Sequence, residues 1–136
     1  MIEDITADGD DHSQLDEAFI GVPKAQSGKW GSCIRIMDPT NGYTCCEIEL
    51  EDNEAAFRMC LCRFARTQEL YLIVGTVKDY EMNPKRLTSA FIHTYRFVES
   101  DKSLALVHKT RVHDTPMAMC GFKGRLLCMT WVGRNC

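Results

Sequence analysis

Residues Glu54–Val112, EAAFRMCLCRFARTQELYLIVGTVKDYEMNPKRLTSAFIHTYRFVESDKSLALVHKTRV, contain four consecutive segments that we predict to be β-strands. These segments are Phe57–Phe64, Leu70–Val77, Ala90–Val98 and Leu104–Val112. Neighbouring side chains on a strand point to opposite faces of the sheet. On that basis the first two segments are apolar on both faces, the third is mixed and the fourth is partly charged. Burial is therefore expected to fall from the first strand to the fourth, which predicts one four-stranded blade of a β-propeller.

The first predicted strand sets the strongest requirement on the fold. Its two faces carry Phe57, Met59 and Leu61 on one side, and Cys60, Cys62 and Phe64 on the other. A sheet that is apolar on both faces needs a cover on each side. We therefore expect this strand to be sandwiched between two neighbouring sheets.

The flanking sequence predicts these neighbouring sheets. Trp30–Met37 and Tyr43–Leu50 are two further strands, joined by a turn rich in Asp, Pro, Asn and Gly. Met117–Phe122 and Arg125–Trp131 form another pair, separated only by Lys123 and Gly124. The fold class predicted is all-β: a partial β-propeller of antiparallel sheets with half a blade, one full four-stranded blade and half a blade.

An internal repeat of about 60 residues supports the propeller interpretation, because propellers are built from repeated blades. Met59-Cys60 recurs as Met119-Cys120. We also match Cys33-Ile34-Arg35-Ile36 with Thr94-Tyr95-Arg96-Phe97, on strand type more than on identity. So few blades leave apolar faces uncovered, and we expect the isolated chain to associate or aggregate.

The chain of 136 residues is divided here into two regions. Residues 1–28 are predicted to be an acidic, largely flexible lead-in, and residues 29–136 the β-propeller fragment. Residues 1–17 contain seven acidic residues and no Lys or Arg, so the rest carries 12 acidic residues against 16 basic ones. A mildly basic body is compatible with a nucleic-acid surface. Ordinary solvated strand edges explain it better, since no basic cluster is larger than Lys85-Arg86.

Targeting signals and membrane segments are absent from the pattern. No apolar run approaches the roughly 20 residues that span a membrane, and the acidic start does not resemble a signal peptide. We expect an intracellular protein with no membrane association. Its eight cysteines are then expected to be thiols, since most lie inside strand patterns.

No residue set predicts catalysis, a cofactor or a metal. Cys60-x-Cys62 and Cys45-Cys46 suggest zinc, but the spacing is unusual and free Cys is a common core residue. The histidines of the strands, His93, His108 and His113, are read as satisfied polar groups. Glu47, Glu49 and Glu51 are expected on an exposed side of an outer strand, where their pKa values have little reason to move. We predict a protein that is not an enzyme and has no small-molecule substrate.

The loop Lys78–Ser89 is the candidate site of partner contact, because loops on a rigid scaffold often carry function. Its candidate contact residues are Asn83, Pro84, Lys85 and Arg86.

Several runs of sequence carry a family resemblance. They include Gly21-Val22-Pro23-Lys24-Ala25, Asn53-Glu54-Ala55-Ala56-Phe57, Leu106-Val107-His108-Lys109-Thr110 and Phe122-Lys123-Gly124-Arg125-Leu126-Leu127. The chain resembles the family of large multi-propeller subunits of splicing factor 3B, of the cleavage and polyadenylation specificity factor and of the damaged-DNA-binding complex. The first two runs favour the splicing factor 3B branch. The tail Cys128–Cys136 departs from the family pattern, which suggests a truncated or frame-shifted gene product.

The resemblance implies a non-catalytic scaffold in the nucleus that acts in U2 snRNP assembly and pre-mRNA splicing. Its implied partners are other splicing factor 3B subunits and U2 snRNP proteins, with RNA contact indirect or weak. The alternative is a propeller adaptor of the damaged-DNA-binding or polyadenylation-factor type, which binds nucleic acid or a ubiquitin ligase.

Overall fold

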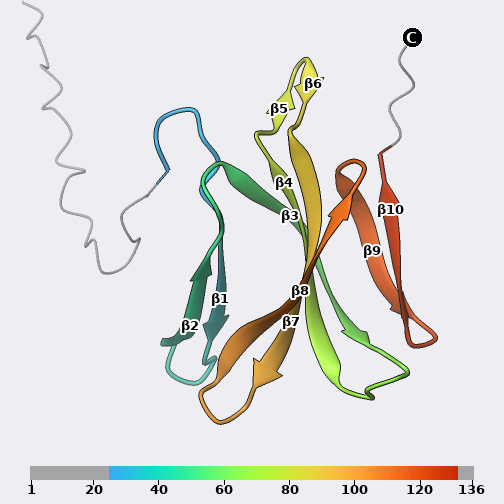
Figure 1. The fold of residues 1–136 in the computed structure, drawn as a ribbon. Helices are drawn as coiled ribbons and strands as arrows, with labels where there is room; N and C mark the ends of the chain where they lie inside the picture. The colour runs from blue at the N-terminus through green and yellow to red at the C-terminus, as the bar shows by residue number, and fades with distance from the viewer. Residues whose placement is uncertain (1–24, 132–136) are drawn as a thin grey trace, which may run out of the picture.

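The computed structural model describes residues 25–131, and strands dominate this part of the chain (Figure 1). The strands are β1 (Cys33–Met37), β2 (Thr44–Glu49), β3 (Glu54–Arg63), β4 (Leu70–Lys78), β5 (Glu81–Met82), β6 (Lys85–Arg86), β7 (Ser89–Val98), β8 (Ser103–Val112), β9 (Pro116–Phe122) and β10 (Arg125–Thr130). All eight predicted strands are present, with ends that differ from the prediction by at most three residues. The lead-in was predicted for residues 1–28, and most of it lies outside the described residues.

The strands form a central antiparallel sheet, two flanking antiparallel pairs and a short hairpin. The central sheet has the order β3-β4-β7-β8, and two-stranded sheets β1-β2 and β9-β10 lie on either side of it (Figure 1). A short hairpin, β5-β6, projects from the loop between β4 and β7. The all-β prediction and the arrangement of half blade, full blade and half blade are confirmed.

Two apolar layers hold the three main sheets together. On one face of the central sheet, Val74, Tyr95 and Leu104 are buried against Ile34, Ile36 and Ile48 of β1 and β2. On the other face, Cys62, Tyr71, Ile73 and Ile92 are buried against Met119, Leu126 and Cys128 of β9 and β10. The central sheet is therefore the middle layer, as its two apolar faces require.

β-Bulges at matching positions confirm the internal repeat. In β3, Phe57 has no partner between Ala56 and Arg58, and in β9, Met117 occupies the same position between Pro116 and Ala118. This match makes Met59-Cys60 equivalent to Met119-Cys120, as predicted. The pairs β1-β2 and β7-β8 also have bulges at matching positions, at Cys45 in β2 and at Val107 in β8. Bulges fix the local register, so these matches define equivalent residues in the half blades and the full blade.

One predicted match within the repeat is wrong. The sequence comparison paired Ile34 with Tyr95, yet Ile34 packs toward the central sheet while Tyr95 packs toward β1-β2. Equivalent residues of a repeat must point in the same direction around the propeller. The shared bulge instead makes Ile36 equivalent to Thr94 and Ile34 equivalent to Ile92. A shift of an odd number of residues turns every side chain to the opposite face, and loose similarity did not detect it.

The predicted gradient of burial is also wrong at its first strand. Strand β4 is the most buried of the sheet, whereas Met59 and Leu61 of β3 are 73% and 54% exposed. Strand β3 lies at the edge of its sheet, and β9 covers only one of its faces. The β1-β2 pair covers the part of the other face formed by β4, β7 and β8. The apolar character of β3 thus marks a surface that no described strand covers.

Gly75 of β4 allows the close approach of β9 to the central sheet. A Cβ at this position would lie 2.8 Å from Cβ of Pro116, which is fully buried at the start of β9. Atoms at such a separation repel each other, so only glycine fits without movement of the neighbouring sheet.

We expect Gly75→Ala to lower the free energy of unfolding by about 1–3 kcal/mol, the usual cost of overpacking a core. Urea denaturation followed by circular dichroism measures it. Ala118→Val, which adds volume at an exposed position of β9, is the control and should change little. Equal stability of Gly75→Ala and the unaltered chain would show that β9 does not press on β4.

Candidate functional site

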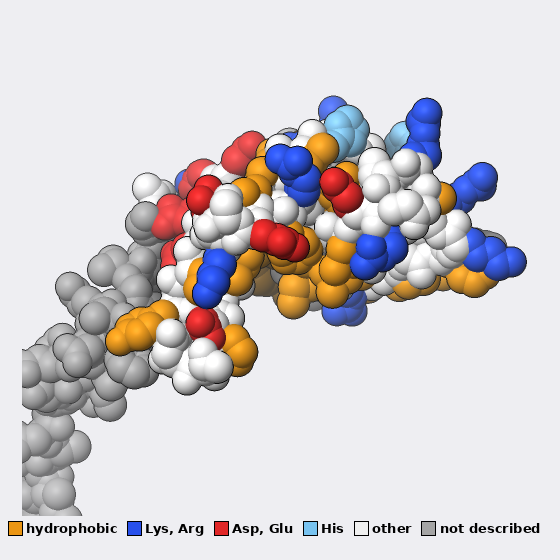
Figure 2. Space-filling model, turned by 90° about the horizontal axis from the view of Figure 1, so that it is seen from below, with side chains coloured by type: hydrophobic (Ala, Val, Ile, Leu, Met, Phe, Trp, Pro, Cys, Tyr) orange, Lys and Arg blue, Asp and Glu red, His pale blue; other side chains and the backbone are white. Residues whose placement is uncertain are grey.

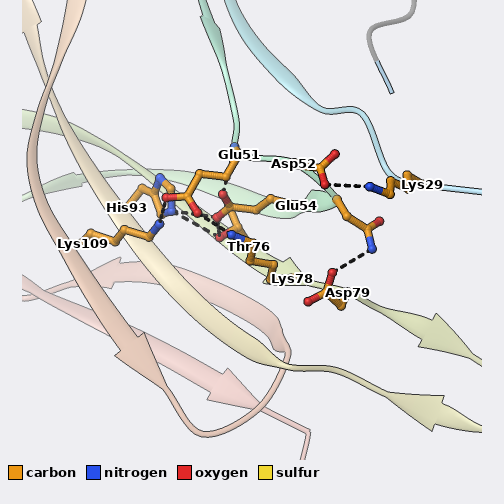
Figure 3. Close-up of polar contacts among 10 residues, drawn as sticks. Lys29, Glu51, Asp52, Glu54, Thr76, Lys78, Asp79, His93 and Lys109 are labelled. Carbon is orange, nitrogen blue, oxygen red and sulfur yellow. Dashed lines mark hydrogen bonds and ion pairs between the residues drawn. The ribbon is translucent and has the colours of Figure 1, made fainter. Parts of the chain in front are cut away.

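A buried polar network crosses three strands of the central sheet (Figure 3). The carboxylate of Glu54, at the start of β3, accepts a hydrogen bond from the Thr76 hydroxyl at 2.5 Å. The same carboxylate oxygen lies 3.0 Å from Nε2 of His93 on β7. Nδ1 of His93 lies 3.0 Å from the hydroxyl of Tyr95. Buried polar groups are stable only when they have such partners, and every member of this network has at least one.

The network also fixes the turn that enters the central sheet. The second carboxylate oxygen of Glu54 accepts a hydrogen bond from the backbone N–H of Glu51, at 3.2 Å. Asn53 has a positive φ of 52°, and its side-chain oxygen accepts a hydrogen bond from the backbone N–H of Trp30. The connection from β2 to β3 is thus tied to the segment before β1 and to the interior of the central sheet.

Burial and hydrogen bonding act in opposite directions on Glu54. Burial alone would raise the pKa of its carboxyl, but hydrogen bonds from His93 and Thr76, together with electrostatic interactions with His93 and Lys109, outweigh burial. The pKa of Glu54 falls from 4.5 to about 2. For Tyr95, burial raises the pKa, and the negative charge of Glu54 raises it further. Glu54 is therefore a carboxylate at neutral pH, and Tyr95 is a neutral phenol.

The network is closed to solvent. Glu54 and Thr76 are fully buried and His93 is 4% exposed, so no substrate in solution reaches them. The prediction that His93 is a satisfied strand histidine is confirmed. Sequence reasoning missed Glu54, although polar Glu54, Thr76 and His93 in otherwise apolar strands were a usable signal for a shared buried site.

A more exposed group of charges surrounds the network (Figure 3). The Glu51 carboxylate accepts hydrogen bonds from Lys109 at 2.7 Å and from Lys78 at 2.6 Å. Both hydrogen bonds lower the pKa of Glu51, and the bond from Lys109 has the larger effect. The expectation that nothing would move the pKa of Glu51 is therefore wrong, because Glu51 lies in the turn after β2, within reach of both lysines. Ion pairs of this exposure contribute little stability individually.

The pKa of Glu54 predicts a pH dependence of stability. A carboxyl whose pKa is depressed on folding stabilises the fold above its unfolded pKa. For Glu54 this contribution, about 3 kcal/mol, is lost as the pH falls from about 4.5 towards 2.

We expect Glu54→Gln to destabilise the fold at pH 7 and to flatten this part of the stability curve. Urea denaturation at a series of pH values between 2 and 7 measures both effects. Glu47→Gln, which alters the surface ion pair with Arg35, should retain the original curve. A Glu54→Gln curve parallel to that of the unaltered chain would contradict the low pKa.

The predicted contact residues lie on the β5-β6 hairpin. Asn83 and Pro84, joined by a cis peptide bond, form its exposed tip, and Arg86 is exposed beside them. Lys85 turns back towards the blade, where its Nζ lies 2.7 Å from Asp114 and 5.6 Å from the centre of the Trp131 ring. All four residues are exposed, and the ion pair of Lys85 with Asp114 also ties the hairpin to the blade.

Three aromatic side chains support the base of the hairpin. The indole N–H of Trp30 donates a hydrogen bond to the backbone oxygen of Tyr80, at 2.8 Å. Phe57 packs edge-to-face against both Trp30 and Tyr80, with ring centres 5.9 and 5.0 Å apart. Edge-to-face contacts add stability beyond simple burial. The hairpin thus projects from a rigid base that unites β3, the segment before β1 and the end of β4.

Of the four cysteines with a sequence-based zinc interpretation, Cys60 and Cys62 belong to the core, whereas Cys45 and Cys46 are half-buried on β2. Cys62 is buried, and Cys60 packs against the same apolar cluster, with Cys128 on the opposing sheet. Burial raises the pKa of all three thiols, which keeps them protonated at neutral pH. Within residues 25–131, no group of three or more His, Cys, Asp or Glu side chains is placed to hold a metal ion. No helix in the same range has the length and apolarity to cross a membrane.

Comparisons with known proteins agree with the architecture. The family model described as the CPSF A subunit region matches residues 31–130, which spans all ten strands and reaches into the tail that was expected to depart from the family. Spliceosome-associated protein 130 A of Arabidopsis thaliana is 48% identical over 129 residues, which cover 93% of this chain. Splicing factor 3B subunit 3 of Danio rerio is 41% identical over 117 residues, 85% of this chain. Pre-mRNA-splicing factor rse1 of Emericella nidulans is 41% identical over 129 residues, 93% of this chain.

These relatives are much longer than this chain, which spans only 10–11% of their length. The family model covers the central blade and both flanking pairs, the part of the chain that carries the fold. The family model covers well over half of the 136 residues. The chain therefore belongs to the CPSF A subunit region family, and the relatives named above are splicing factors.

Proposed function

We propose that this chain is a non-catalytic protein-interaction scaffold of the splicing factor 3B type, acting in U2 snRNP assembly and pre-mRNA splicing in the nucleus. The observation that carries the proposal is the combination of exposed apolar strand faces with a polar network that is closed to solvent. Met59, Leu61, Leu127 and Met129 are all more than half exposed, although they lie on strands. Exposed apolar patches of this kind mark protein interfaces. The likeness to splicing factors supports a role in splicing.

The charged surface favours protein partners over RNA. Figure 2 shows acidic and basic side chains on the same face, with hydrophobic side chains between them. Many bases are also occupied: Lys29, Arg35, Lys78, Lys85 and Lys109 all form ion pairs with carboxylates. Nucleic-acid binding relies on basic side chains that are free to neutralise phosphates. RNA contact through this chain is therefore indirect or weak in this proposal.

The proposed partners are other splicing factor 3B subunits and U2 snRNP proteins, and the β5-β6 hairpin is the proposed contact. Met82 is 66% exposed on this hairpin, beside the exposed Arg86. An apolar side chain next to a positive charge, on a rigid support, suits an apolar and acidic protein surface.

Affinity purification of the tagged chain from nuclear extract, followed by mass spectrometry, tests the function. We expect splicing factor 3B and U2 proteins, in amounts that nuclease treatment does not change. Recovery of ubiquitin-ligase components, or binding to DNA or RNA that falls steeply with salt, would favour the alternative adaptor class and contradict the proposal.

The hairpin contact has its own test. Met82→Asp combined with Arg86→Glu should reduce recovery of these partners at least tenfold, since it reverses the charge and removes the apolar contact. Arg66→Glu, an exposed charge reversal on the β3-β4 loop, is the matched control and should leave recovery unchanged. Equal recovery with the hairpin variant would move the contact elsewhere on the molecule.

A further inference from the structure

A cavity lies where the ladder between β7 and β8 ends, at the base of the β5-β6 hairpin. The last pair of this ladder joins Ala90 to Val112. Just beyond it, residues from both strands and from the segment that leaves the hairpin line a cavity of about 350 Å³, a size usual for ligand sites. The lining residues are Leu87, Thr88, Ser89, Arg111, Val112 and His113. The walls of the cavity therefore belong to the central blade and its hairpin.

Basic side chains and a hydroxyl form much of the polar lining. Arg111, near the end of β8, and His113, just after β8, are exposed, whereas Ser89 at the start of β7 is half-buried. A guanidinium group carries five N–H donors and no acceptor, and its planar fork matches a carboxylate. Leu87 and Val112 add half-buried apolar surface, against which methylene groups can pack. The lining thus suits an anionic group on a short apolar stem.

The carboxylates that adjoin the lining residues are engaged with other partners. Asp114 follows the cavity in sequence, and its carboxylate lies 2.7 Å from Nζ of Lys85. The hydroxyl of Thr88 donates a hydrogen bond to Asp79, which is the main cause of the lowered pKa of that carboxyl. Both carboxylates are therefore held by contacts that do not involve Arg111. The guanidinium group of Arg111 keeps its donors for a ligand in the cavity.

The surroundings of the cavity favour a single carboxylate over a nucleic acid. A nucleic acid presents successive phosphates, and a protein binds it with a series of free basic side chains. Here Arg111 and His113 are flanked by the carboxylates of Asp79 and Asp114, and Lys85 is paired with Asp114. A polyanion that passed the cavity would be repelled by these flanking charges. One acidic side chain could enter between them.

We propose that this cavity binds one acidic side chain, an aspartate or glutamate of a partner protein. Arg111 forms a bidentate ion pair with the carboxylate, while His113 and Ser89 donate hydrogen bonds to it. The inference rests on the proposed function, because it locates the acidic part of the partner surface that the β5-β6 hairpin contacts. Leu87 directly follows Arg86 of the hairpin, so a partner on the hairpin also reaches the cavity.

Charge reversal in the cavity tests the ion pair. We expect Arg111→Glu to reduce recovery of splicing factor 3B and U2 proteins from nuclear extract at least tenfold, because two carboxylates would then face each other. Arg111→Lys keeps the charge but loses the bidentate geometry, so its recovery should lie between those of Arg111→Glu and the unaltered chain. Arg66→Glu on the β3-β4 loop is the control and should leave recovery unchanged. Circular dichroism establishes that each variant retains its strands.

Cross-linking identifies the group in the cavity. Arg111→Lys places an amine there, and a carbodiimide joins an amine to a carboxylate only when the two are in direct contact. Mass spectrometry of the treated complex should find position 111 linked to an aspartate or glutamate of a splicing factor 3B or U2 protein. The Arg66→Lys control should show no such link at position 66.

The outcomes separate this inference from the proposed function. Equal recovery of the splicing proteins with Arg111→Glu and with the unaltered chain would overturn the inference and leave the proposed function intact. A link from position 111 to a carboxylate of the same polypeptide, such as one of the acidic residues of 1–17, would show that the protein fills its own cavity and would also overturn it. Recovery that nuclease abolishes would indicate RNA in place of the acidic side chain. Failure of the unaltered chain to recover any splicing protein would overturn the proposed function as well.

Discussion

The central sheet has apolar side chains on both faces, and this one constraint organises the molecule. Ile73 and Val74 are neighbours on β4, point in opposite directions, and are both almost completely buried. A single covering layer could bury only one of these two side chains. The β1-β2 and β9-β10 pairs satisfy the constraint on the two sides, so a chain of this length forms three layers and not a two-layer sandwich.

The two flanking pairs cover different parts of the central sheet. The β1-β2 pair lies over the outer part of the central sheet, and β9-β10 lies over the inner part, where Gly75 admits Pro116. This offset leaves Met59 and Leu61 of β3 exposed, while Ile73 and Val74 in the middle of the central sheet are buried.

A buried charge lies where two of the layers meet. Glu54 is held at the point where the chain leaves the β1-β2 pair and enters the central sheet, with partners on β4 and β7. A buried carboxylate is tolerated only because its oxygens have hydrogen-bond partners. Its bonds to the Glu51 backbone, Thr76 and His93 hold the connection from β2 to β3 against the central sheet.

The strands and their order followed from the sequence, because alternation and turn residues are local properties. Met59-Cys60 and Met119-Cys120 also revealed the repeat. The tertiary structure alone decided which apolar faces are covered. The sequence of β3 predicts an interior strand, yet Met59 is exposed. It also decided that Glu54, Thr76 and His93 meet, that Lys85 turns away from the hairpin tip, and that Ile36 corresponds to Thr94. Each of these depends on contacts between residues far apart in the chain, or on bulges that shift the register, and neither leaves a reliable local pattern.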